Sequence, residues 1–427
     1  MILQELRDRG FFQQCTDFDA LAAQLEREPT VAYVGVDPTG PSLHAGHLVP
    51  IVKMIHFARA GHKPIILIGG GTAKIGDPSG KTEMRKMQSE ETIAQNAASI
   101  QKQVEALAGS LDVELTFLNN AEWLDSLNYI AFLRDIGRHF SVNRMLSFET
   151  YKRRLETGLS FIEFNYQLLQ SYDFKVLYEG HGCRLQVGGD DQWGNIVAGA
   201  DLIRRTAGDD NVYGLTFPLV TRADGKKMGK TEEGAVFLDP ALFPPYEFFQ
   251  YWRNVPDADV RRFLALYTFL PMQEIDELTG PGASAAGAST LGASGLGAPD
   301  AGQINKAKER LAFELTNLIH GESEATAALE AARTTFSAAT SGDRSAIPST
   351  SVASDELETG IPVLELYTRS GLAGSKSEAR RLVRQGGARV NDRKIEGEEV
   401  VIDTSWLEEG ELLLRAGKKR YHRIVPG

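Results

Sequence analysis

The stretch 31-VAYVGVDPTGPSLHAGH-47 decides the fold. An apolar run at residues 31–36 is followed by a turn rich in proline and glycine, and apolar residues then recur at helical spacing from Leu48 to Phe57. This order predicts a strand, a turn and a helix. Such a unit is typical of an α/β fold with a Rossmann-like, doubly wound parallel sheet, and we expect that fold for residues 1–240.

His44 and His47 stand one turn apart at the start of the predicted helix, and Gly46 lies between them. In a doubly wound sheet a nucleotide lies outside the carboxyl ends of the strands, where a helix N-terminus offers free N–H groups and a positive dipole end. Glycine leaves room for a ribose or a base to approach the backbone. This HAGH segment (residues 44–47) predicts a nucleotide site, although histidines that only cap a helix would give the same pattern.

A second segment, Lys227-Met228-Gly229-Lys230-Thr231, lies much further along the chain, between strand-like stretches at 215–220 and 235–238. Two ammonium groups at i and i+3, with a threonine hydroxyl group, suit a triphosphate and the charge that develops on departing pyrophosphate. A lysine pair alone is more often part of an ordinary surface loop. Together with the HAGH segment, this KMGKT segment (residues 227–231) predicts a split ATP site.

With both segments in this order, the chain resembles the class I aminoacyl-tRNA synthetases. Ala45 stands where that family usually has isoleucine, and Gly229 where it usually has serine. The resemblance implies ATP-dependent activation of an amino acid and its transfer to tRNA, with Mg²⁺ arriving on ATP and no tightly bound cofactor. The catalytic residues that it implies are His44, His47, Lys81, Arg85, Lys227, Lys230 and Thr231. The ATP-binding residues that it implies are Asp37, Thr39, His44, Gly46, His47, Gly189, Asp191, Lys227 and Lys230.

The residues between the two segments indicate the amino acid. Tyr166, Gln170 and Asp173 follow one another at steps of four and three in the helical stretch 161–177, so they share one helix face. Buried polar side chains need partners, which a ligand can supply, whereas core packing is the commoner role of a tyrosine. With Tyr33, these residues resemble the bacterial tyrosyl-tRNA synthetases. The tyrosine-binding residues that the resemblance implies are Tyr33, Asp77, Tyr166, Gln170, Asp173, Gln186 and Gln192.

The segment 188-GGDDQWGN-195 is a third match to that family. By the resemblance, Asp191 reaches the ribose hydroxyl groups and Gly189 lets the sugar lie against the backbone. Tyr33 and Asp173 would bond the phenol hydroxyl group of the substrate. The tryptophanyl-tRNA synthetases share the paired segments but lack that phenol-binding pair and the C-terminal module, so tryptophan is the second choice.

Charge is distributed unevenly along the chain. The whole chain has a formal net charge of −11, but residues 361–427 carry 13 Lys and Arg against 10 Asp and Glu. Within this tail, residues 375–391 read as a capped helix, a glycine stop and a strand, similar to a small RNA-binding fold shared with a ribosomal protein. A solvated charged face is the alternative, but phosphate binding depends on clustered rather than net charge. The expected RNA-binding residues are Lys376, Arg380, Arg381, Arg384, Lys418, Lys419 and Arg420.

A chain of 427 residues is long enough for several domains. Residues 280–299 contain 15 Gly, Ala or Ser and no charged residue, which predicts a flexible insertion at 280–302. The expected order is a Rossmann-like catalytic domain at 1–240, a helical anticodon-side domain at 241–340, a linker at 341–358, and a small α+β RNA-binding domain at 359–427.

Other features of the sequence indicate the cellular compartment and the oligomeric state. The two cysteines, Cys15 and Cys183, are too few for a disulfide framework and favour a reducing compartment. No run of residues approaches a membrane span, and we expect a cytoplasmic protein. No carboxylates are spaced as a dedicated metal site. By the resemblance we expect a homodimer whose contact lies near residues 120–160.

Two other classes of function remain open. One is a non-catalytic RNA-binding protein on a decayed synthetase fold, against which the intact polar residues His44, Asp77, Asp191 and Lys227 argue. The other is a metabolic adenylyl transferase of the same fold, which would have no use for the basic tail. Pyrophosphate exchange measured with each of the twenty amino acids distinguishes the three.

Overall fold

The structure is a computed structural model, and it describes residues 2–79, 87–223, 228–229, 234–280, 301–341, 347–391, 393–408, 410–417 and 420–427. The chain divides into two compact units, Met1–Ala325 and Thr326–Gly427. Seven residues implied in function lie outside the described residues, namely Lys81, Arg85, Lys227, Lys230, Thr231, Lys418 and Lys419. Most of the predicted insertion at 280–302 lies outside them too.

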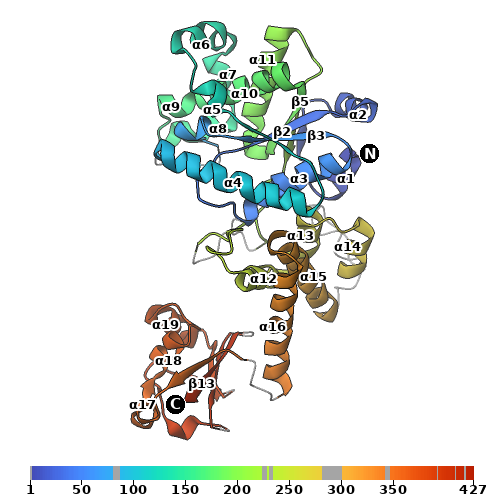
Figure 1. Cartoon of the computed structure of the whole chain (residues 1–427). Coiled ribbons are helices and arrows are strands. Elements are labelled where there is room, and N and C mark those ends of the chain that lie inside the picture. Colours follow the sequence, from blue (N-terminus) through green and yellow to red (C-terminus); the bar gives the residue numbers. More distant parts are fainter. Residues whose placement is uncertain are drawn as a thin grey trace, which may run out of the picture. The chain divides into compact units, whose positions relative to one another are not determined.

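The first unit is built on a six-stranded sheet with the order β1-β6-β5-β2-β3-β4 (Figure 1). Its strands are β1 (Gln14–Cys15), β2 (Val31–Val36), β3 (Lys63–Ile68), β4 (Thr116–Asn119), β5 (Cys183–Gly189) and β6 (Tyr213–Phe217). Neighbouring strands from β6 to β4 run parallel, and β1 is antiparallel at the edge. The order reverses between β2 and β5, which is the point where such sheets bind ligands. The predicted doubly wound fold is confirmed.

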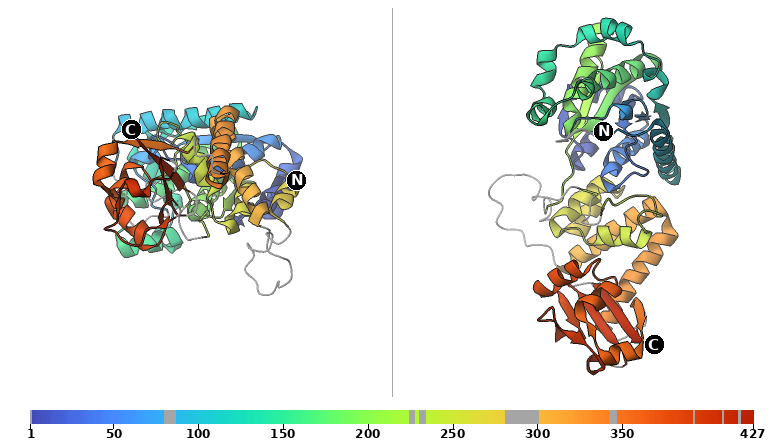
Figure 2. Two further views of the ribbon diagram at one scale, coloured as in Figure 1. Left: turned by 90° about the horizontal axis from the view of Figure 1, so that it is seen from below. Right: turned by 90° about the vertical axis from the view of Figure 1, so that its left-hand side faces the viewer.

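Helices cover both faces of this sheet (Figures 1 and 2). Tyr33, Ile65 and Leu67 pack against α10 (Tyr166–His181) and α11 (Trp193–Ala207). Because side chains alternate along a strand, the intervening residues point to the other face, where α3 (Leu48–Arg59) packs on β2 and β3. The predicted helix after the HAGH segment is therefore confirmed.

The remaining elements before β6 are mostly short helices. The α-helices are α1 (Ile2–Asp8), α2 (Phe18–Arg27), α4 (Glu90–Ser110), α5 (Ala121–Leu124), α6 (Tyr129–Asp135), α7 (Val142–Ser147), α8 (Glu149–Thr157) and α9 (Phe161–Phe164). The 3₁₀ helices are η1 (Ala45–His47), η2 (Thr72–Lys74), η3 (Gly137–His139) and η4 (Asp190–Gln192). The strand expected at 235–238 is wrong, because the structure has isolated bridges there and no strand, and one of these bridges joins His44 to Phe237.

A helical region follows the sheet. Its helices are α12 (Pro245–Arg253), α13 (Val260–Tyr267), α14 (Met272–Thr279), α15 (Ala301–His320) and α16 (Glu322–Ser341), with the 3₁₀ helix η5 (Asp257–Asp259). The helical domain expected after the sheet is confirmed, and Gly321 (φ +90°) separates α15 from α16. The buried Arg9 guanidinium, directly after α1, donates to the carbonyl groups of Ala265, Thr268 and Leu270 at 2.9–3.3 Å, and these bonds tie the helical region to the N-terminal segment.

The second unit contains a five-stranded sheet with the order β10-β9-β12-β13-β7 and a two-stranded sheet, β11-β8. The strands are β7 (Ser349–Val352), β8 (Ile361–Pro362), β9 (Ala388–Val390), β10 (Arg393–Lys394), β11 (Val401–Ile402), β12 (Leu412–Ala416) and β13 (Arg420–Pro426). The helices are α17 (Ser354–Thr359), α18 (Val363–Arg369), α19 (Lys376–Arg384) and the 3₁₀ helix η7 (Thr404–Trp406). Its core includes Leu366, Tyr367, Val390, Leu414 and Ile424.

The linker expected at 341–358 is wrong for its described C-terminal part. β7 pairs with β13, and Leu357 of α17 is fully buried in the core of the second unit. Ser349, Thr350 and Ser351 belong to an edge strand, whose hydrogen bonds come from the backbone and need no apolar side chains. Among the described residues, no helix is long and apolar enough to cross a membrane.

Candidate active site

A cavity of about 270 Å³ lies at the carboxyl ends of β2 and β5. Its wall brings together side chains from β2, η2, α10, β5 and η4, which are far apart in sequence. The residues predicted from the sequence that line it are Tyr33, Asp37, Thr39, His47, Asp77, Tyr166, Gln170, Asp173, Gln186, Gly189, Asp191 and Gln192. All seven residues predicted for tyrosine therefore share one cavity with five of those predicted for ATP.

The described part of the KMGKT segment lies directly against the HAGH segment. The Val236 amide donates to the Gly229 carbonyl group, and the Ala45 amide donates to the Val236 carbonyl group, both at 2.9 Å. Gly229 has φ +77°, and a Cβ atom there would lie 2.7 Å from the Gly46 nitrogen. Glycine at position 229 is therefore required by the close approach of these two segments.

The two histidines of the HAGH segment stack on each other, with ring centroids 3.8 Å apart. His44 Nδ1 accepts from the Gly46 amide at 3.0 Å, and His47 Nδ1 accepts from the His44 amide at 3.3 Å. The capping role that the sequence left open is thus present in the structure. His47 also lines the cavity, whereas His44 and Gly46 are not among its lining residues.

Asp37 lines the cavity and is held by two hydroxyl groups. Tyr166 Oη donates to one oxygen of Asp37 at 2.9 Å, and Thr72 Oγ1 donates to the other at 2.8 Å. A Cβ atom on Gly69 would lie 2.0 Å from that second oxygen, so the backbone there has room only for glycine. Burial, followed by the negative charge of Asp37, raises the pKa of Tyr166 well above its usual range. Tyr166 therefore stays a neutral donor.

Asp173 is buried beneath the cavity and is held by two donors. Asn120 Nδ2 donates to one of its oxygens at 2.9 Å, and Trp123 Nε1 donates to the other at 2.8 Å. Burial raises the pKa of Asp173 to about 7, although both hydrogen bonds act in the opposite direction. Sequence reasoning missed Asn120, Trp123 and Thr72. The position of Asn120 could have pointed to it, because this residue directly follows β4 at the carboxyl edge of the sheet, where ligands bind.

A chain of amide and carboxylate groups completes the wall. Gln192 Nε2 donates to Asp77 at 2.8 Å, and Asn195 Nδ2 donates to the side-chain oxygens of Gln192 and Gln170 at 3.1 and 2.9 Å. Asp191 stands at the start of η4, and burial, followed by the charge of Asp77, raises its pKa to about 6. These contacts fix the polar groups of α10 and α11 toward one another before any ligand binds.

Two buried polar atoms at the cavity have no hydrogen-bond partner within the described residues, the Tyr33 hydroxyl group and Gln186 Oε1. The two residues are register partners on β2 and β5, and both line the cavity. Buried polar atoms are rarely left unpaired, so these two call for a ligand that supplies the missing partners. The Tyr33 pKa is raised well above its usual range by burial and then by Asp173, so its hydroxyl group remains protonated.

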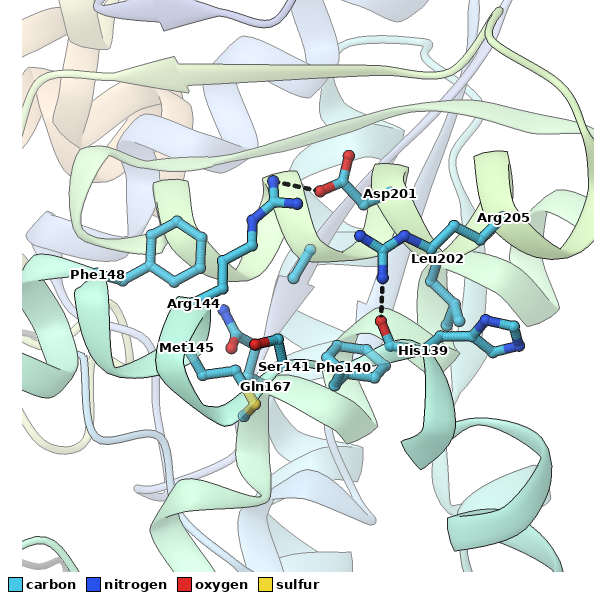
Figure 3. Close-up of a pocket in the computed structure, with 11 residues that line it drawn as sticks. His139, Phe140, Ser141, Arg144, Met145, Phe148, Gln167, Asp201, Leu202 and Arg205 are labelled. Carbon is cyan, nitrogen blue, oxygen red and sulfur yellow. Dashed lines mark hydrogen bonds and ion pairs between the residues drawn. The ribbon is translucent and has the colours of Figure 1, made fainter.

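A second cavity, of about 30 Å³, lies among η3, α7, α10 and α11 and contains none of the predicted site residues (Figure 3). Arg144 pairs with Asp201, and Arg205 donates to the His139 carbonyl group. A Cβ atom on Gly194 would lie 2.8 Å from the Phe148 ring, so this segment packs tightly on the start of α11. The volume suits one or two waters rather than a substrate.

The predicted RNA-binding residues in the described part of the second unit lie on two elements. Lys376, Arg380, Arg381 and Arg384 are exposed on α19, and Arg420 begins β13. Ser375 caps α19 by accepting from the Glu378 amide, as the sequence predicts. One face of this helix therefore carries clustered positive charge.

The comparisons with known proteins agree with this architecture. Residues 25–337 match the family of tRNA synthetases class I (W and Y), and residues 342–424 match the tyrosine–tRNA ligase SYY-like C-terminal domain. The chain belongs to the class I tRNA synthetases of the tryptophan and tyrosine group.

Similar proteins narrow the resemblance within that family. The chain is 55% identical over 424 residues to the tyrosine–tRNA ligase of Treponema denticola, which covers 99% of this chain and 98% of the relative. It is 52% identical to the tyrosine–tRNA ligase of Treponema pallidum, with the same shares covered. A C-terminally truncated mitochondrial tyrosyl-tRNA synthetase of Aspergillus nidulans has a TM-score of 0.66 and 29% identity, and covers 78% of this chain and 93% of that one. The resemblance seen in the sequence is confirmed.

The raised pKa of Asp173 predicts how stability depends on pH. Asp173 keeps its proton up to about pH 7 in the folded protein, but the unfolded chain releases it near its ordinary value of 3.8. This group's contribution to stability is therefore fully present below pH 4 and is lost as pH rises to 7. Between pH 5 and pH 8, the loss of this contribution lowers the free energy of unfolding by about 2 to 3 kcal/mol.

We expect Asp173→Asn to remove that part of the pH dependence in denaturant unfolding at pH 5 and pH 8. Asp135→Asn is the matched control, because Asp135 is exposed and its pKa is lowered, first by its hydrogen bond from Arg134. An unchanged pH dependence in Asp173→Asn would show that Asp173 is ionised in the free protein.

Proposed function

We propose that this chain is a tyrosine–tRNA ligase. It activates L-tyrosine with ATP to tyrosyl-adenylate and pyrophosphate, and it then transfers the tyrosyl group to the terminal adenosine of tRNA(Tyr). The observation that carries this proposal is the unpaired Tyr33 hydroxyl group near the buried Asp173 carboxyl group, in a cavity at the switch point of the sheet. A phenol hydroxyl group can accept from the first and donate to the second.

The amino-acid end of the substrate fits the acidic side of the cavity. Asp37 and Asp77 line this side, and an α-ammonium group is the part of tyrosine that such a wall attracts. We assign the ammonium group to Asp77, Tyr166 and Gln170, and the phenol hydroxyl group to Tyr33 and Asp173. Gln186 and Gln192 complete the pocket. The Asn120 and Trp123 donors hold Asp173, and its remaining lone pairs are available to a ligand in the cavity that it lines.

The nucleotide takes the other side of the cavity. We assign its phosphates to Thr39 and His44, and its ribose side to His47, Gly189 and Asp191. Asp37 and Gly46 complete the ATP-binding residues. ATP enters as its Mg²⁺ complex, which is a substrate. Lys81, Arg85, Lys227, Lys230 and Thr231 are predicted to bind the phosphates and the departing pyrophosphate.

Both chemical steps are substitutions without a covalent enzyme intermediate. A carboxylate oxygen of tyrosine attacks the α-phosphorus, and the bond to the bridging oxygen breaks as Mg²⁺-pyrophosphate leaves. A ribose hydroxyl group of the tRNA then attacks the tyrosyl carbonyl carbon, and AMP leaves. The enzyme contributes position and electrostatic stabilisation.

Amino-acid selectivity tests the phenol assignment. A site that hydrogen-bonds a substrate hydroxyl group rejects an analogue without it by about 10⁴ to 10⁵, a magnitude measured on tyrosyl-tRNA synthetases themselves. ATP–pyrophosphate exchange across the twenty amino acids should therefore respond to tyrosine and barely to phenylalanine. Tyr33→Phe should reduce the ratio of kcat/KM for tyrosine over phenylalanine by about ten- to a hundredfold. Equal exchange with both amino acids in the wild type would refute the assignment.

We also propose a homodimer that works in the cytoplasm. Ten large apolar side chains of the described chain are exposed, and five of these lie within residues 129–161. They are Tyr129, Ile130, Val142, Leu155 and Phe161, which are 52–71% exposed. Exposed apolar side chains gathered in one segment are typical of a protein contact, and this segment overlaps residues 120–160, where the sequence placed it.

Charge substitution tests the dimer. Ile130→Glu combined with Phe161→Glu would place unpaired carboxylates in the contact, so we expect dissociation to monomers with a Kd at least about a hundredfold higher. Sedimentation velocity over a concentration series measures this. Leu242→Glu, at a residue that is 46% exposed outside the segment, serves as the control and should stay dimeric. A double variant that sediments like the wild type places the contact elsewhere.

The two half-reactions should separate when the tail is removed. The cavity belongs entirely to the first unit, whereas the basic face of α19 belongs to the second. A chain ending at Ser341 should keep tyrosine-dependent pyrophosphate exchange within about twofold and lose most tRNA charging, because it lacks the phosphate contacts of the tail. A folded truncated enzyme that charges tRNA as well as the full chain would exclude a tRNA-binding role for the tail.

A further inference from the structure

A carboxylate from another segment, that of Glu398, lies between Arg380 and Arg384 on the basic face of α19. Arg380 Nε donates to Glu398 Oε2 at 2.8 Å, and Arg384 Nε donates to Glu398 Oε1 at 2.5 Å. The arginines are four residues apart on one face of the helix, and Glu398 reaches them from the segment between β10 and β11. Each guanidinium group therefore binds one oxygen of the same carboxylate.

The arrangement is open to solvent on the arginine side. The side chain of Arg384 is 71% exposed and that of Arg380 is 45% exposed, whereas Glu398 is 24% exposed. Burial alone would raise the pKa of Glu398, but the hydrogen bonds from Arg384 and Arg380 outweigh it and lower the pKa. Glu398 is therefore ionised at neutral pH, and the cluster of three side chains has a net charge of only +1.

A phosphate group, like the Glu398 carboxylate, offers the two arginines negatively charged oxygen atoms as hydrogen-bond acceptors. Two of its non-bridging oxygens can accept from two guanidinium groups at once, with the charge and spacing of a carboxylate. A phosphate added beside Glu398 would meet its negative charge at short range, which is unfavourable even at a protein surface. The phosphate and Glu398 therefore compete for the same two arginines.

We propose that Glu398 is an intramolecular competitor of RNA phosphate. It occupies Arg380 and Arg384 in the free protein, and a tRNA phosphate displaces it on binding; this rests on the proposed function of the tail. Binding of RNA without sequence preference comes almost wholly from phosphate contacts. Masking two arginines weakens such contacts for every RNA, so only an RNA with further contacts to the protein binds well. Glu398 thereby suppresses non-specific binding of RNA at the expense of affinity.

The test uses the full-length protein and the substitution Glu398→Gln. Exposed ion pairs are individually weak, so we expect binding of tRNA(Tyr) to tighten by about three- to tenfold at low salt, and binding of a non-cognate tRNA to tighten at least as much. Filter binding or fluorescence anisotropy over a salt series measures both affinities. Glu399→Gln is the matched control, since Glu399 is exposed in the same segment and forms no ion pair with a described residue. It should change affinity by less than about twofold.

The proposal requires that the gain depends on the arginines. In the Arg380→Gln, Arg384→Gln background the Glu398→Gln substitution should have no effect on tRNA affinity. Each arginine substitution alone should weaken binding and lower the slope of log affinity against log salt by about 0.7 to 0.9. Weaker binding by Glu398→Gln would show that Glu398 positions the arginines instead, and unchanged binding would also overturn the proposal.

A failure of the proposed function is distinguishable from a failure of this inference. If the arginine substitutions leave tRNA affinity unchanged, the tail does not bind tRNA through α19, whatever Glu398 does. If they weaken it but Glu398→Gln does not tighten it, only the competitor role is wrong. Tyrosine-dependent pyrophosphate exchange and the melting temperature should stay at wild-type values in Glu398→Gln, because this residue lies in the second unit.

Discussion

Burial of the Asp173 carboxyl group is the constraint on which the rest of the site depends. A carboxylate in the protein interior is unfavourable unless donors surround it, and Asn120 and Trp123 provide two. Asn120 also accepts from the Gly71 amide and donates to Thr72, and Thr72 in turn donates to Asp37. The position of one buried acid is thus linked, through the end of β4 and η2, to the acid on the other side of the cavity. In the proposed function, a substrate with a hydroxyl group at one end and an ammonium group at the other completes this network.

The local order of the chain was predictable because it depends on neighbouring residues. The strand at 31–36, the turn and the helix after the HAGH segment follow from apolar spacing, and the shared face of Tyr166, Gln170 and Asp173 follows from helical geometry. Asn120 and Trp123 were not predictable in this way, since their partner Asp173 lies on another helix. Only the rule that functional groups gather at the carboxyl ends of parallel strands pointed toward them.

Two errors have a common physical cause. The residues at 235–238 are apolar enough for a strand, yet they pair with the HAGH segment through isolated backbone contacts. The residues at 349–352 are polar enough for a linker, yet they pair with β13 as an edge strand. In both places the structure depends on which backbone segment is available for pairing. The side-chain composition of the segment itself does not reveal that partner.

Position 229 shows how such a distant contact can still explain a residue that the sequence left unexplained. Glycine replaces the serine usual in the family, and the sequence alone gives no reason for the change. The left-handed backbone at Gly229 and its approach to the Gly46 nitrogen provide one.

The charges of the tail also depend on contacts between residues that are distant in sequence. Spacing along α19 predicted the clustered arginines, but their ion pairs with Glu398 arise from a segment beyond β10. The charge that this helix exposes is therefore set by the fold rather than by the count of basic residues.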